Sequence, residues 1–134
     1  PFRASLAAVI AASEGAGVIV TIHSYTPVYN GKPREVELGI LHDSDARLAD
    51  ALLANAYQHT SLRVRRNEPY GPQDGVTHTL LEHAVSNGLH NVMIEIRNDL
   101  IATPEAQDGV AEMLSRLISS GLRDLSIAGA GGDT

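Results

Sequence analysis

Two polar residues stand where buried strands are expected, and their chemical types suit hydrolysis. His23 directly follows the apolar and β-branched run 18–22, and Glu95 lies within a second apolar run, 92–96. Burying an unpaired carboxylate costs roughly several kcal/mol, so Glu95 must be neutralised, paired with a cation or held near a metal. Arg97 follows two residues later, on the same face of a regular strand. Together the three suit metal-assisted hydrolysis, with His23 as a metal ligand, Glu95 as the base for a metal-bound water and Arg97 as an anchor for a carboxylate or oxyanion.

The segments that must hold these residues alternate between strand and helix patterns. We expect strands that end at His23, cover 35–41, cover 61–65 and contain Glu95, and helices over 2–13, from Asp43 or Ser44 to about 57, from Thr77 to 87, and from Thr103 through 118. This order predicts an α/β fold with three layers and a mostly parallel or mixed sheet. Because the carboxyl ends of parallel strands share one edge, we expect His23, Asn67 and Glu95 to meet there. Residues 35–41 alternate between polar and apolar, which indicates a half-exposed strand near an edge.

The composition limits the kinds of partner and the number of domains. The chain has 134 residues, a net charge of −6 and a pI near 5.4, and it contains no cysteine. This length suits one domain, expected over residues 1–126, before a Gly-rich tail at 127–134 that is expected to be disordered. The acidic balance argues against a nucleic-acid partner, and no segment approaches the about 20 apolar residues of a membrane helix. The first residues also lack the features of a signal peptide, and we expect a cytoplasmic protein. Because the chain has no cysteine, any metal must be bound by His, Asp or Glu.

Four motifs, taken in order, resemble the N-formylglutamate amidohydrolase family. They are His23-Ser24-Tyr25-Thr26-Pro27, Asn67-Glu68-Pro69-Tyr70, His83 within an expected helix, and Glu95-Ile96-Arg97-Asn98-Asp99-Leu100-Ile101. The resemblance extends to about Ile118. That family is similar in turn to zinc carboxypeptidases, so the resemblance implies a fold of the phosphorylase/hydrolase-like, zinc-carboxypeptidase-like type. Family members are longer than this chain, which implies that the chain is the C-terminal portion of a larger catalytic domain.

The same resemblance implies an activity and roles for particular residues. It implies a zinc-dependent enzyme, with Zn²⁺ as cofactor, that hydrolyses the N-formyl or another N-acyl amide of an acidic amino acid such as N-formylglutamate. In that enzyme His23 is a zinc ligand, Glu95 is the general base, and the remaining metal ligands lie upstream of Pro1. The residues that the resemblance places around the small-molecule substrate are Ser24, Asn67, Tyr70 and Arg97.

Simpler structural roles stay open for these residues. His23 could be a histidine at the edge of the core, Glu95 and Arg97 could neutralise each other, and residues 67–70 could form a turn without chemistry. The chain could also be a carboxypeptidase-like deacylase or peptidase, or a non-catalytic fragment or binding module that holds no metal. His42, which follows the strand expected at 35–41, is a spare ligand candidate. A half-domain would expose a sheet edge and an apolar face, so a homo-oligomer is a further expectation.

Overall fold

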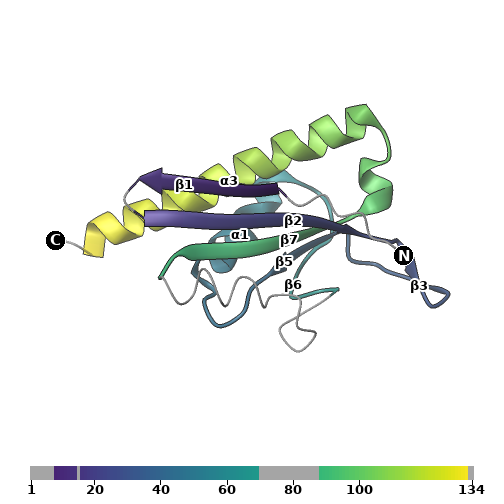
Figure 1. Ribbon diagram of the computed structural model, residues 1–134, viewed down its shortest axis with the longest axis horizontal. Helices are drawn as coiled ribbons and strands as arrows, with labels where there is room; N and C mark the ends of the chain where they lie inside the picture. The colour runs from purple at the N-terminus through teal and green to yellow at the C-terminus, as the bar shows by residue number, and fades with distance from the viewer. Residues whose placement is uncertain (1–7, 15, 70–87, 133–134) are drawn as a thin grey trace.

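The computed structural model describes residues 8–14, 16–69 and 88–132, with side chains described over 18–69 and 88–126 (Figure 1). In this part of the chain a five-stranded sheet forms the centre of the fold, in the order β1-β2-β7-β5-β6. Its strands are β1 Ala8–Glu14, β2 Ala16–Tyr25, β7 His90–Arg97, β5 Leu38–Leu41 and β6 Val64–Arg66. Tyr70, His83 and the helix expected over 77–87 lie outside the described residues.

The sheet is mixed rather than fully parallel. β2 runs parallel to β7, and β5 runs parallel to β6. The two halves meet in an antiparallel pair between β5 and β7, and β1 adds an antiparallel edge beside β2. The prediction of an α/β fold with a mixed sheet is therefore confirmed, and β2 and β7 are the two apolar runs expected to carry His23 and Glu95.

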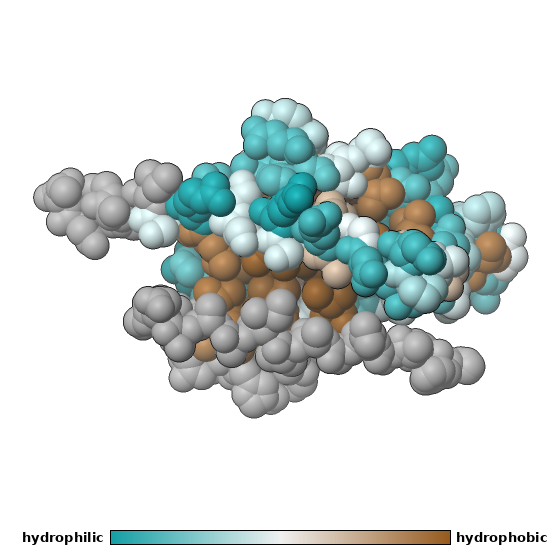
Figure 2. Space-filling model, turned by 90° about the horizontal axis from the view of Figure 1, so that it is seen from above, coloured by the Kyte–Doolittle hydropathy of each residue, from teal (hydrophilic) through white to brown (hydrophobic). Residues whose placement is uncertain are grey.

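Helices α1 Arg47–His59 and α3 Pro104–Gly132 pack together on one face of the sheet, behind it in the view of Figure 1. A 3-10 turn, η3 Asn98–Ile101, joins β7 to α3. The core between helices and sheet is buried and consists mainly of Val20, Leu38, Ile40, Val92, Ile94, Ile96, Leu48, Leu52, Leu114 and Leu117. Figure 2 shows hydrophobic side chains gathered in the middle of the molecule and hydrophilic ones mostly along the upper part of the view. This arrangement of a sheet and flanking helices is consistent with the three-layer α/β fold expected from the sequence.

Short elements complete the described part. Strands β3 Val28–Tyr29 and β4 Lys32–Pro33 form a small hairpin beyond the end of β2. The start of α3 agrees with the sequence, because the Thr103 hydroxyl accepts a hydrogen bond from the Ala106 backbone N–H at 3.1 Å, as an N-cap residue does. Among the described helices, none combines the length and hydropathy that crossing a bilayer requires.

Two of the expected elements differ from the structure. The helix expected over 2–13 is wrong where the structure describes that segment, because Ala8–Glu14 forms strand β1. Its short apolar pattern suits either a helix or a strand. The segment forms a strand because it pairs with the edge of β2, where Ala8 lies opposite Ile22. The strand expected at 35–41 is shorter, and it is buried between β7 and β6 instead of half-exposed near an edge.

Helix ends also differ from the sequence patterns. Helix α1 begins at Arg47, and its N-cap, Ala46, makes no side-chain capping bond, so neither Asp43 nor Ser44 caps it. Instead the Asp45 carboxylate accepts a bond from the Arg47 backbone N–H at 3.1 Å. At the other end of the chain, the helix expected from Thr103 through 118 is longer, because α3 continues to Gly132.

Candidate functional site

His23 and Glu95 lie side by side on neighbouring strands. They are register partners in the parallel pair of β2 and β7, where strands are about 4.8 Å apart. Alternation along each strand places both side chains on the face opposite to α1 and α3, because Val20 and Ile94 on the other face belong to the helix-covered core. Glu95 is only 5% exposed, and His23 is half-buried. The sheet therefore holds an imidazole beside a buried carboxylate, as the sequence predicts.

On its other side Glu95 is paired with Gly39 of β5. A Cβ atom added at Gly39 would lie 2.0 Å from the backbone carbonyl oxygen of Glu68, so the Glu68 main chain rests directly on the sheet there. Opposed residues of an antiparallel pair share a face, which places this main chain on the Glu95 side. The sequence patterns did not identify Gly39, although a glycine inside a strand can signal such a close backbone approach.

The segment 67–69 reaches the site by a different route from the one expected. Strand β6 runs antiparallel to β7, so its end lies away from the carboxyl end of β2, and the expectation of one shared edge is wrong for Asn67. The Asn67 backbone N–H bonds the Ile40 carbonyl at 3.0 Å, and Asn67 has a left-handed conformation with φ 53°. This turn brings the following residue, Glu68, back over Gly39.

The side chain of Asn67 is directed toward His42. Its amide oxygen accepts a hydrogen bond from the His42 backbone N–H at 2.9 Å. The His42 ring contacts protein groups through both nitrogens, with Nδ1 at 2.7 Å from the Asp43 carbonyl and Nε2 at 2.9 Å from an Arg66 guanidinium nitrogen. His42 follows Leu41, which pairs with Met93 nearer the start of β7, so this spare ligand candidate does not join His23.

Arg97 is held by protein acceptors on several sides. Its Nε and Nη2 atoms bond the two Asp99 carboxylate oxygens at 2.7 and 3.2 Å, and its Nη1 bonds the Arg34 carbonyl at 2.8 Å. A Glu37 carboxylate oxygen lies 3.8 Å away. The hydrogen bonds to Asp99 raise the pKa of Arg97 above its ordinary value. Arg97 thus shares the site face with Glu95, and the ion pairs that the structure gives it are with Asp99 and Glu37.

Tyr25, the register partner of Arg97, closes the end of β2. It is 3% exposed, and its hydroxyl donates a hydrogen bond to the Val36 carbonyl. Burial raises the pKa of Tyr25 above its ordinary value, against the lowering effect of the Arg97 and Arg34 guanidinium groups. The Glu95 carboxylate raises the same pKa, so its charge reaches Tyr25. The phenol therefore stays protonated at neutral pH and remains a donor.

The remaining residues predicted from the sequence are placed differently. Ser24 pairs with Ile96, and alternation puts it on the helix-covered face, opposite to His23. Asn67 contributes its backbone turn rather than its amide to the neighbourhood of Glu95. The structure thus brings His23, Glu95 and Arg97 together on one face.

The candidate site contains some of the donors that the metal expected from the sequence would need. His23 supplies an imidazole beside a carboxylate, and these are donors that zinc accepts, but a catalytic zinc site takes three protein ligands. Within residues 8–14, 16–69 and 88–132 the structure contains no group of three or more His, Asp or Glu residues that could hold a metal ion. His23 is therefore one donor of the kind that such a site uses.

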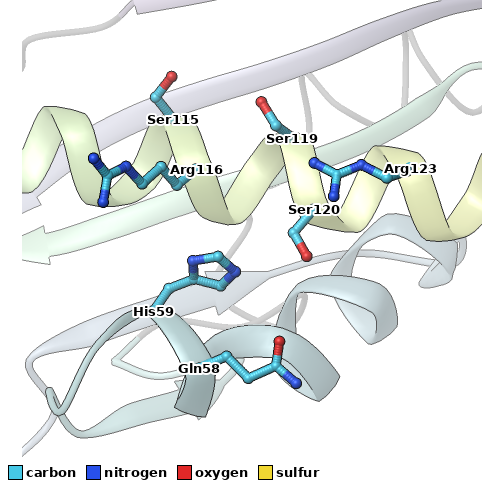
Figure 3. Close-up of a pocket in the computed structure, with 7 residues that line it drawn as sticks. All are labelled: Gln58, His59, Ser115, Arg116, Ser119, Ser120 and Arg123. Atoms are coloured by element: carbon cyan, nitrogen blue, oxygen red, sulfur yellow. The ribbon is translucent and has the colours of Figure 1, made fainter.

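A separate hollow lies between the end of α1 and the middle of α3 (Figure 3). Its volume is about 390 Å³, and its lining residues are Gln58, His59, Ser115, Arg116, Ser119, Ser120 and Arg123. The lining contains no carboxylate that could act as a base. Because α1 and α3 cover the face opposite to Glu95, this hollow is distinct from the candidate site.

Comparisons with known proteins identify the family of this chain. A sequence model of the N-formylglutamate amidohydrolase family matches residues 1–102. The crystal structure of a gene product from Agrobacterium tumefaciens is similar, with 60% sequence identity and a TM-score of 0.80. The match covers 83% of this chain and 44% of that one, so the matched part spans less than half of that protein. No protein with a curated description matches the chain.

Proposed function

Because this chain belongs to the N-formylglutamate amidohydrolase family, we propose that it carries the reaction centre of an enzyme that cleaves the N-formyl or another N-acyl amide of an acidic amino acid. The observation that carries the proposal is the register pair of His23 and the buried Glu95. A buried carboxylate on a rigid strand, next to an imidazole, suits proton transfer during amide hydrolysis.

In the proposed reaction Glu95 acts as general base and then as general acid. It takes a proton from the attacking water, and the resulting hydroxide adds to the amide carbon. Collapse of the tetrahedral intermediate breaks the C–N bond, and Glu95 returns the proton to the leaving amine. N-formylglutamate and water would give formate and glutamate.

The cofactor proposed for this reaction is Zn²⁺, with His23 as one of its ligands. When bound, zinc lowers the pKa of a coordinated water and polarises the carbonyl group. The position of the His23 imidazole, in register with the buried Glu95, supports this role for His23.

The proposed pocket wall includes the residues around this pair. Arg97 contributes a fixed guanidinium, and the 67–69 segment covers the sheet beside Glu95. Asn67 supports that cover through its turn, and Tyr70 follows directly in sequence. Ser24, whose side chain lies on the helix-covered face, is left out of this wall. The family resemblance is the basis for proposing that the residues of the wall contact the substrate.

The protein should release formate from N-formyl-L-glutamate, and it should prefer this substrate to N-formyl-L-leucine by at least about 10-fold in kcat/KM. Each well-made polar contact to an acidic side chain is worth about this factor or more. Formate release, measured with both substrates and with N-acetyl-L-glutamate, checks the activity and the acyl group. Hydrolysis of none of the three would overturn the proposal, and equal rates on both formyl compounds would overturn the preference.

A further inference from the structure

The guanidinium of Arg97 is already hydrogen-bonded to protein acceptors. Asp99 accepts two bonds from it, at 2.7 and 3.2 Å, and the Arg34 carbonyl takes a third N–H at 2.8 Å. The Asp99 carboxylate therefore occupies the bidentate position that a substrate carboxylate would need. An acidic substrate side chain near the end of β2 would then pair with another cation.

Arg34 is a second cation in that region. Its guanidinium carbon lies 5.3 Å from the centroid of the Tyr25 ring and 4.8 Å from that of the Tyr29 ring. Its Nη1 donates to the Thr26 carbonyl at 3.1 Å, and its backbone N–H donates to the Pro27 carbonyl at 2.8 Å. These contacts hold the charged end of Arg34 against the strand end that carries the candidate site.

The two tyrosines fix Arg34 from different directions. The Tyr25 ring is buried and its hydroxyl bonds the Val36 carbonyl, so this side of the contact is rigid. Tyr29, in the β3–β4 hairpin, is 60% exposed and forms the solvent side. Contacts between a guanidinium and aromatic faces restrict the long side chain before a ligand binds, which lowers the entropy cost of binding.

We propose that Arg34 is a specificity residue that binds the side-chain carboxylate of the acidic N-acyl amino acid, in an orientation fixed by Tyr25 and Tyr29. The proposal rests on the amidohydrolase function proposed above. Tyr25 follows His23 by two residues on the same strand face, a separation of about 6.6 Å along the strand. In the proposed arrangement the amide of the substrate lies at Glu95, and its side-chain carboxylate lies at Arg34, which stacks on Tyr25.

The charges around Tyr25 support this geometry. Both the Arg34 guanidinium and the Glu95 carboxylate affect the pKa of the Tyr25 hydroxyl, so both charges act on the same phenol group. The planar fork of an arginine matches a carboxylate better than the single ammonium of a lysine does. Arg34→Lys should therefore keep the charge and lose part of the selectivity.

N-formyl-L-glutamate and its neutral isostere N-formyl-L-glutamine test the assignment. We expect Arg34→Met to lower kcat/KM for the glutamate compound on the order of 100-fold, because a desolvated charge pair is removed, and to change the value for the glutamine compound less than about 3-fold. Arg34→Lys should give an intermediate loss. Arg123→Met, in the hollow between α1 and α3, should leave the ratio of the two substrates unchanged.

Binding measured by calorimetry in the Glu95→Gln background separates this proposal from the proposed function. A preference for N-formyl-L-glutamate over the glutamine compound that disappears with Arg34→Met supports the role of Arg34, even if the chain hydrolyses neither compound and the proposed function fails. A preference that survives in Arg34→Met overturns the role of Arg34, even if hydrolysis is observed. An equal loss for both compounds makes Arg34 structural and also overturns it.

Discussion

Glu95→Gln should lower kcat for N-formyl-L-glutamate by about 10²–10⁴-fold, the usual contribution of a positioned general base, and leave KM within about 3-fold. Glutamine has nearly the shape of glutamate but cannot take a proton from water. Glu95 is 5% exposed in the middle of the sheet, where a larger change would disturb packing. The measurement is formate release under saturating substrate, together with a thermal melt that verifies folding.

Glu112→Gln is the matched control, because Glu112 is an exposed carboxylate on α3 whose ion pair with Arg116 faces solvent. This variant should retain full activity. A folded Glu95→Gln protein with activity close to that of the wild type would remove Glu95 from the reaction and leave it a structural carboxylate.

Gly39→Ala should lower the free energy of unfolding by about 3 kcal/mol, the upper range for forcing an extra carbon into a packed site. The added Cβ would lie 2.0 Å from the Glu68 carbonyl oxygen, which is main chain and cannot rotate away. We also expect activity to fall, because the 67–69 segment must lift from its place beside Glu95. Urea unfolding and formate release measure the two effects.

Two other glycines provide a graded comparison. Gly109 has open space around it, so Gly109→Ala should stabilise α3 by up to about 1 kcal/mol. At Gly121 a Cβ would lie 2.7 Å from the end of the flexible Leu52 side chain, so that substitution should cost less than Gly39→Ala. If Gly39→Ala is as stable as Gly121→Ala, the Glu68 main chain does not rest on the sheet as described.

The proximity of His23 and Glu95 could be predicted from the sequence, because His23 directly follows one apolar run and Glu95 lies within another. Such runs form strands buried on both faces, and buried strands of this kind pair in parallel. The structure confirms this for β2 and β7. The N-cap at Thr103 was also predictable, because a capping hydroxyl followed by proline is a local signal.

The rest of the site depends on contacts between distant segments, which local patterns do not contain. The direction of β5 and β6 follows from pairing with β7, so the sequence placed the end of β6 at the wrong edge. The engagement of Arg97 by Asp99 and the position of Arg34 against two rings depend on loop geometry. The Ala-rich start of the chain suits a helix by propensity, and the open edge of β2 overrides that preference.

The most direct test of the account is whether His23 and Glu95 act as one unit. Residues that act together lose activity non-additively, so the double variant His23→Ala/Glu95→Gln should be no slower than Glu95→Gln alone, within about 3-fold. The measurement is kcat/KM for formate release by the wild type, the two single variants and the double variant. Losses that multiply in the double variant, or full activity in His23→Ala, would contradict the account.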